Sequence, residues 1–228
     1  MKFMKKIIAG ALFALVINNA QAQIVEGQDY TVLSKPIPVI NNKKVEVLEF
    51  FAYSCVHCYH LEKDLSKEVK KFPPDVYFRQ EHVVWDEQMA VLAKISAAAN
   101  ISGTNMQATP AVFHLLFEER DKANLVLNPS AFKQWANEQG AWGKKLAKAY
   151  DNQATVAAAE KMAQYTMNYG INSTPQLIVG GKYRLNNPTD FSALRELIDK
   201  VRSENGIKPA KPVAQQRLGA MIAAQANR

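Results

Sequence analysis

Cysteine is scarce in this sequence, and its scarcity limits what the two cysteines can do. The 228 residues contain only two cysteines, Cys55 and Cys58, with two residues between them. A structural zinc site needs four ligands, and the sequence has no second cysteine pair to complete the set. His57 and His60 lie on the same predicted helix as the two cysteines, so they cannot readily complete a tetrahedron around the metal. Covalent haem attachment needs a histidine directly after the second cysteine, where Tyr59 stands. A bridge across so short a loop constrains the unfolded chain little, so the pair favours redox chemistry over a structural role.

A membrane-spanning hydrophobic run is also missing from the N-terminal region. The apolar run at residues 7–17 is too short to cross a bilayer comfortably. It follows three lysines within the first six residues and precedes a small–x–small pattern that ends at Ala22. This order is typical of a secretory signal peptide, so we expect residues 1–22 to be removed by cleavage after Ala22. The alternative is a retained membrane anchor. Export would place the protein outside the cytosol, where disulfides persist.

The charge pattern lacks the clusters that nucleic-acid binding requires. Lysine and arginine number 28 against 21 acidic residues, which gives a formal charge of +7. Loss of residues 1–22 removes three lysines and no acid, and leaves about +4. The basic residues are scattered among acidic ones, which is typical of a solvated surface. We therefore expect no nucleic-acid partner.

Residues 45–84 carry the pattern of a strand–helix–strand unit. Residues 45–51 are β-branched and aromatic, as in a buried central strand, and residues 30–39 predict an extended segment before it. Ser54 is the expected N-cap of a helix that ends before two prolines and has one apolar stripe, Leu61, Leu65, Val69 and Phe72. A second strand is predicted at residues 76–84. Such a unit implies parallel strands with a right-handed crossover.

The remainder of the chain changes from helices back to strands. Residues 87–169 show several helical apolar stripes and almost no β-branched alternation. Strand signals return at residues 176–185, where Gly180 and Gly181 predict a hairpin with a two-residue turn. A final amphipathic helix is predicted to start at Thr189, and its inward face consists of Phe191, Leu194, Leu197, Ile198 and Val201.

These patterns predict an α/β fold with a discontinuous sheet domain. We assign residues 23–86 and 164–205 to this domain and residues 87–163 to an inserted helical domain. The C-terminal tail, residues 206–228, is rich in Ala, Gln, Pro and Lys, a composition typical of a flexible segment. The alternative for the tail is a short docking helix around Leu218, Met221 and Ile222.

The position of the cysteine pair gives each thiol a distinct role. Cys55 is expected at a helix N-terminus, where backbone N–H groups and the helix dipole favour a thiolate. Cys58 lies one turn further on the same face, close enough to form a bridge. We interpret Cys55 as the attacking thiolate and Cys58 as the resolving thiol. His57 can stabilise the thiolate by a hydrogen bond or a positive charge, which would make the disulfide more oxidising; the alternative is an exposed histidine without a role.

The stretch Phe50-Phe51-x-x-x-Cys55-Val56-His57-Cys58-Tyr59 resembles the DsbA family of periplasmic disulfide oxidases. The resemblance extends over most of the mature chain and includes the helical insertion and Thr174-Pro175. It implies a thioredoxin fold with an inserted α-helical domain, a periplasmic location, and folding secreted proteins with free cysteines as substrates. It also implies reoxidation by a DsbB-type, quinone-linked membrane oxidase. We expect a monomer without a bound cofactor or metal.

Three further residues take a role from the resemblance. Pro175 matches the cis-proline that faces the dithiol, so Thr174 would present its backbone to an extended substrate. Glu49 matches the buried acid beneath the dithiol and would relay a proton to and from Cys58. From the residues alone, Pro175 could simply begin a strand, and Glu49 could reach water at a strand end. Relatives often carry a lysine beside this acid, and the nearest match here is Gln80.

The sequence leaves three functions to be distinguished. We expect a dithiol oxidase that introduces disulfide bonds into exported proteins through Cys55 and Cys58. The first alternative is a reductase or isomerase on the same fold. The second is a non-catalytic peptide-binding chaperone, whose function would survive replacement of both cysteines.

Overall fold

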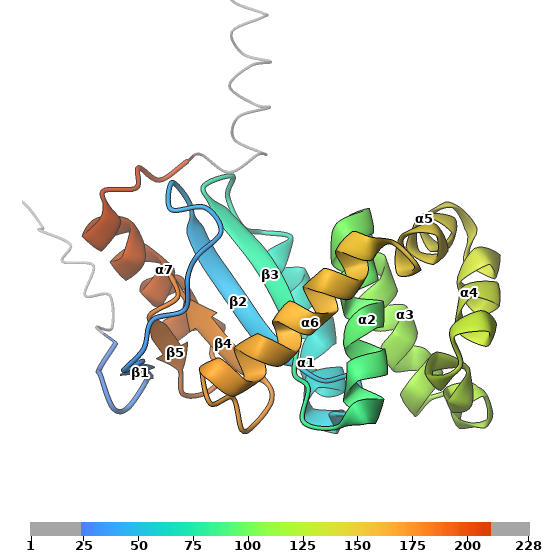
Figure 1. The fold of residues 1–228 in the computed structure, drawn as a ribbon. Coiled ribbons are helices and arrows are strands. Elements are labelled where there is room, and N and C mark those ends of the chain that lie inside the picture. The colour runs from blue at the N-terminus through green and yellow to red at the C-terminus, as the bar shows by residue number, and fades with distance from the viewer. Residues whose placement is uncertain (1–23, 211–228) are drawn as a thin grey trace, which may run out of the picture.

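The central sheet joins strands that lie far apart in the sequence. The structure, a computed structural model, describes residues 24–210. Within these residues the sheet has five strands in the order β1-β5-β4-β2-β3 (Figure 1). β2 and β3 are parallel, and the other neighbours are antiparallel. The strands are β1 (Tyr30–Val32), β2 (Val45–Phe51), β3 (Val76–His82), β4 (Gln176–Val179) and β5 (Tyr183–Leu185).

The predicted strand–helix–strand unit is confirmed at the centre of this sheet. All seven residues of β2 are buried, as expected of a strand covered on both faces. Helix α1, Val56–Val69, connects β2 to β3, and the two strands pair in parallel along their whole length. This arrangement places the start of α1 directly beyond the end of the most buried strand.

Helices cover both faces of the sheet. Helix α1 and helix α7, Phe191–Asn205, pack on one face through Leu61, Leu65 and Leu194. Helix α6, Gln153–Asn168, crosses the other face, where Tyr165 joins the cluster of Leu48 and Phe50 (Figure 1). No helix within residues 24–210 is both long and apolar enough to cross a membrane.

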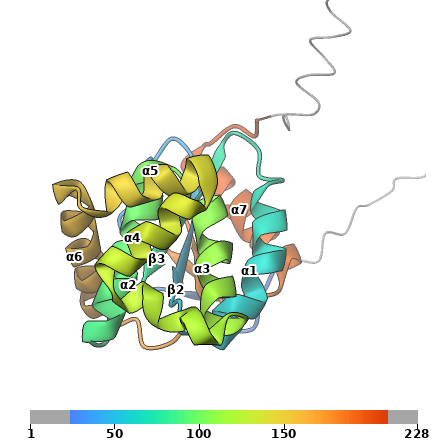
Figure 2. The same ribbon diagram turned by 90° about the vertical axis from the view of Figure 1, so that its right-hand side faces the viewer.

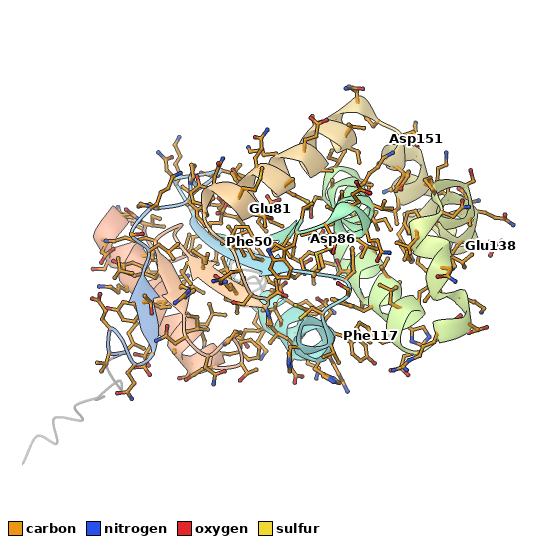
Figure 3. All side chains as sticks on the ribbon, turned by 60° about the horizontal axis from the view of Figure 1, so that its bottom comes forward. Phe50, Glu81, Asp86, Phe117, Glu138 and Asp151 are labelled. Carbon is orange, nitrogen blue, oxygen red and sulfur yellow. The ribbon has the colours of Figure 1, made fainter. Side chains whose placement is uncertain are left out.

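The predicted helical region forms a lobe beside the sheet, on the right in Figure 1 and in front of the sheet in Figure 2. Its core contains Phe51, Tyr53 and Cys58 together with Val112 and Phe113, so the lobe and the sheet share one buried cluster at the dithiol. Figure 3 shows Glu138 at the far end of the lobe. The lobe consists of α2 (Glu87–Ser102), α3 (Asn105–Phe117), the 3-10 helix η1 (Arg120–Leu127), α4 (Pro129–Glu138) and α5 (Gly140–Tyr150).

The chain returns from the lobe to the sheet without a break. Helix α6 runs uninterrupted from Gln153 to Asn168, so the predicted boundary between residues 163 and 164 falls inside one helix. The predicted signal peptide at 1–22 and all but the start of the predicted tail at 206–228 lie outside the described residues.

Two local predictions were wrong at the ends of elements. Cys55, not Ser54, caps α1, because its sulfur accepts a hydrogen bond from the N–H of Cys58. The strand predicted to reach residue 84 ends at His82. The extended segment predicted at residues 30–39 contains β1, Tyr30–Val32, which lies at the edge of the sheet.

The β4–β5 hairpin has a longer connection than the predicted two residues. Val179 pairs with Tyr183, so Gly180, Gly181 and Lys182 all lie between the strands. Both glycines have positive φ, +60° and +67°. The N–H of Lys182 still donates to the carbonyl of Val179 at 3.2 Å, and Lys182 is then an extra residue before β5 begins.

Candidate active site

The two thiols lie at the start of α1 in different surroundings. Cys55 is partly exposed, whereas Cys58 is only 1% exposed, and both are free thiols. The N–H of Cys58 donates to the Sγ of Cys55 at 3.2 Å. The first turn of the helix therefore directs a backbone donor at the sulfur expected to attack, and the second thiol lies beneath it.

Hydrogen bonds lower the pKa of Cys55 to about 5. The largest cause is the hydrogen bond with the Cys58 thiol; the Thr174 side chain and backbone N–H groups of Cys58 and His57 act in the same direction, while partial burial opposes them. The pKa of Cys58 is raised, first because its thiol donates that bond and then because it is buried. At neutral pH the pair is therefore a Cys55 thiolate above a Cys58 thiol.

His57 influences Cys55 through its backbone in this structure. Its N–H is among the donors that lower the pKa of Cys55. Among residues 24–210, the hydrogen bonds recorded for the Cys55 sulfur involve Cys58 and Thr174, and none involves the His57 imidazole. That ring instead lines a pocket beside the dithiol. The role predicted for the imidazole stays a prediction.

The loop before β4 brings Thr174 and Pro175 against the dithiol. The peptide bond between these two residues is cis, the state that the resemblance implies. The Cys55 thiol donates to the carbonyl oxygen of Thr174 at 3.5 Å across 119 residues of sequence. Thr174 therefore contacts the reactive sulfur through its main chain, the part that a substrate peptide would also use.

A pocket of about 480 Å³ opens beside this contact. Three separate segments form it: the first turns of α1, the loop with Pro175, and the start of α7. Its lining is mostly apolar and consists of His57, His60, Leu61, Asp64, Thr174, Pro175, Pro188, Thr189 and Phe191. Sequence reasoning placed Leu61 and Phe191 on inward helix faces but missed the pocket, because no periodicity shows which helices meet.

Glu49 lies in the interior beneath the dithiol, as the resemblance implies. It is 1% exposed, so its carboxyl group does not reach water at the strand end. The β2–β3 register places Gln80 opposite it, and the Gln80 Nε2 donates to Glu49 Oε2 at 2.8 Å. Burial first, and then the charge of Glu62, raises the pKa of Glu49 to about 8. The charge of Glu49 in turn raises the pKa of Cys58.

Sequence reasoning missed two buried ionisable residues near the dithiol. Glu62 is 8% exposed and follows Cys58 by four residues, which places both on one helix face; this spacing could have revealed it. His82 is fully buried, its Nε2 accepts the N–H of Tyr53 at 2.9 Å, and burial lowers its pKa to about 4. His82 thereby holds the turn between β2 and α1 in place.

The described residues form no metal centre. Within residues 24–210, no group of three or more His, Cys, Asp or Glu side chains is arranged to hold a metal ion.

A thiol with a lowered pKa above a buried partner thiol is built to exchange disulfides with other molecules. The sheet and helices that present this pair have the thioredoxin fold, so the protein is a thiol:disulfide oxidoreductase. The family model described as Thioredoxin matches residues 41–200. The thiol:disulfide interchange protein DsbA of Burkholderia cepacia is 30% identical over 187 residues, which cover 79% of this chain and 87% of that protein.

Solved structures give the same assignment. Reduced DsbA1 from Neisseria meningitidis aligns with a TM-score of 0.75 and 42% identity, and covers 82% of this chain and 100% of that one. The oxidoreductase DsbA3 from the same organism aligns with a TM-score of 0.67 and 46% identity, covering 80% and 100%. The chain belongs to the DsbA family of thiol:disulfide interchange proteins.

Proposed function

We propose that the protein is a periplasmic dithiol oxidase that introduces disulfide bonds into exported proteins through Cys55 and Cys58. The observation that carries this proposal is the lowered pKa of Cys55, about 5. A stabilised thiolate favours the reduced enzyme, and each pKa unit corresponds to about 1.4 kcal/mol, or about 30 mV for two electrons. Because Cys55 is partly exposed, solvent screening makes the real gain smaller than the full shift. Cys58 is protonated at neutral pH with or without its raised pKa. The raised pKa of Cys58 therefore does not cancel the stabilisation of the reduced enzyme by the Cys55 thiolate.

The reaction consists of two exchanges. A substrate thiolate attacks the Sγ of Cys55, the Cys55–Cys58 bond breaks, and its electron pair passes to Cys58, which takes up one proton. A second substrate thiol loses its proton and attacks the substrate sulfur of the mixed disulfide, so that Cys55 leaves as a thiolate. Two substrate thiols are oxidised to one disulfide, and the enzyme disulfide is reduced to a dithiol.

The substrates are unfolded or folding secreted proteins with free cysteines. An extended segment of such a chain fits beside Cys55, with its backbone against Thr174 and an apolar side chain in the neighbouring pocket. A DsbB-type, quinone-linked membrane oxidase then removes the two electrons and restores the Cys55–Cys58 disulfide. The likeness to DsbA proteins supports both assignments.

The decisive experiment measures the equilibrium potential of the Cys55–Cys58 couple in glutathione buffers and titrates the Cys55 thiolate in the same protein. We expect a potential well above the thioredoxin value of about −270 mV and a thiolate midpoint near pH 5. A potential at or below the thioredoxin value would overturn the proposal and indicate a reductase. The double variant Cys55→Ser/Cys58→Ser is the control, because full activity without both thiols would indicate a peptide-binding chaperone.

A further inference from the structure

A single glutamine side chain joins two carboxyl groups beneath the dithiol. The Nε2 of Gln80 donates to Glu49 Oε2 at 2.8 Å and to Glu62 Oε2 at 3.5 Å. Its Oε1 accepts from the Thr109 hydroxyl at 3.3 Å, and its main-chain carbonyl accepts from Asn100 at 2.8 Å. Asn100 of α2 therefore holds the Gln80 main chain, and Thr109 of α3 holds its side chain with the amide N–H groups toward the two acids.

This bridge contains hydrogen-bond donors but no charge. A carboxamide offers two N–H groups and cannot neutralise an anion, whereas two buried carboxylates that share a site repel each other. A proton can remove that repulsion where no cation does. We propose that Glu49 and Glu62 act as one carboxyl pair that holds a single proton at neutral pH, with Glu62 as the positioning residue that keeps this proton on Glu49.

Each carboxyl group of the pair faces a different environment. Glu49 lies beneath the dithiol and is 1% exposed. Glu62 lines a cleft of about 630 Å³ between α1 and α3, bordered by Ser66, Lys67 and Lys70. The Ser66 hydroxyl donates to Glu62 Oε1 at 2.7 Å. Protons from solvent therefore reach the pair at Glu62, and the proton on Glu49 serves the dithiol.

The other groups around the pair are consistent with a proton held on Glu49 and with access to solvent at Glu62. Burial, ahead of all other causes, raises the pKa of Glu62, while Ser66, Gln80 and the charge of Lys70 oppose it. From α1, the thiolate of Cys55 adds a negative charge that raises the pKa of Glu49. The remaining neighbours are the Cys58 thiol, the Tyr53 hydroxyl, Thr109 of α3, Leu177 of β4, and Lys63 and Lys67 at the rim of the cleft.

The pair deepens the proposed function and rests on the uptake of one proton by Cys58 in that reaction. When the Cys55–Cys58 bond breaks, Cys58 leaves with the electron pair and takes the proton of Glu49. Glu49 is then an anion held by the Gln80 N–H, and a solvent proton restores the pair through the cleft. During reoxidation the same proton moves in the opposite direction, from Cys58 to Glu49.

The test is a titration of the glutamate side-chain carboxyl groups by carbon-13 NMR in the full-length reduced protein. In the wild type, the signals of Glu49 and Glu62 should follow the same two steps, with the upper midpoint near pH 8. Glu62→Gln keeps the size of the side chain and removes the charge, so the Glu49 midpoint should fall by at least about one unit. Gln80→Lys places a cation between the two acids and should lower the Glu49 midpoint further.

Glu118→Gln is the matched control. Glu118 borders the same cleft from the α3 side and does not bond to Gln80, so its replacement should leave the Glu49 midpoint unchanged. Two wild-type carboxyl groups that are both ionised at pH 7, or an unchanged Glu49 midpoint in Glu62→Gln, would overturn the inference. The wild-type titration decides the question even where a variant fails to fold.

A kinetic measurement separates a positioning role from a structural one. The rate at which Cys58 attacks a mixed disulfide on Cys55 should show a pH midpoint that shifts in Glu62→Gln by the same amount as the NMR midpoint. A variant with a merely loosened fold would change the rate at every pH alike, which would contradict the inference. A thioredoxin-like potential together with a shifted Glu49 midpoint would overturn the oxidase proposal and leave the carboxyl pair standing.

Discussion

The Sγ of Cys55 lies 3.5 Å from the carbonyl oxygen of Thr174, although 119 residues separate them in the sequence. The thiol hydrogen that makes this contact is lost when Cys55 ionises or forms a disulfide. The carbonyl can then accept the backbone N–H of a peptide whose cysteine is bonded to Cys55. The same main-chain group thus bonds the protonated form of Cys55 in one state and the bound substrate in another.

Replacing Cys58 should raise the pKa of Cys55, because the Cys58 thiol is the largest cause of its lowering. Cys58→Ala removes this donor and should raise the pKa by about 1–2 units. Cys58→Ser keeps an O–H donor at the same place and should raise it less. Titration of the thiolate absorbance in both variants checks the prediction, and equal shifts would show that the hydrogen bond is not the cause.

Phe191→Ser should slow the oxidation of peptides without slowing that of small thiols. The ring lines the pocket beside the dithiol, and the loss of about 1.4 kcal/mol of apolar contact corresponds to about tenfold in binding. The oxidation rate of a cysteine-containing peptide measures the first effect, and the oxidation rate of dithiothreitol measures the second. Met167→Ser, at a residue 70% exposed on α6, is the control. Equal slowing with both substrates would point to damage at the dithiol itself.

His82 should make the fold less stable in acid. Its pKa is lowered by burial to about 4 from 6.5, so the unfolded chain binds a proton that the folded protein does not. Stability is therefore lost as the pH falls from about 6.5 to about 4, by at most about 3 kcal/mol. His82→Gln retains an acceptor for the Tyr53 N–H and should remove this dependence. Urea unfolding of the wild type and of His82→Gln between about pH 4 and pH 6.5 tests the prediction. The difference in their free energies of unfolding must change with pH, and a constant difference would contradict the prediction.

Gly181→Ala should destabilise the protein far more than Gly170→Ala. Both glycines have positive φ, +67° and +60°, which costs a residue with a Cβ about 1 kcal/mol. At Gly181 the added carbon would also lie 2.0 Å from the carbonyl oxygen of Ile37, whereas at Gly170 nothing lies within 4 Å. We expect a loss of about 1 kcal/mol for Gly170→Ala and more than about 3 for Gly181→Ala by urea unfolding. Similar losses would mean that the backbone near Ile37 yields easily.

Patterns within one segment were enough to predict the central unit of the fold. The apolar character of Val45–Phe51 predicts a buried strand, and the stripe of Leu61 and Leu65 predicts the helix that follows it. The spacing of Cys55 and Cys58 at the start of that helix predicts an attacking and a resolving thiol. Each of these inferences depends on neighbours along the chain, whose geometry is set by local backbone periodicity.

Contacts between distant segments were decided only by the tertiary structure. Sequence periodicity shows that Leu61 and Phe191 face inward, but not that the turns around them border a common pocket with Pro175. It likewise shows an acid in a buried strand, but not that Gln80 joins Glu49 to Glu62. The reason is physical: burial and the register of pairing strands determine which polar groups meet in the interior, and both arise only when the whole chain packs.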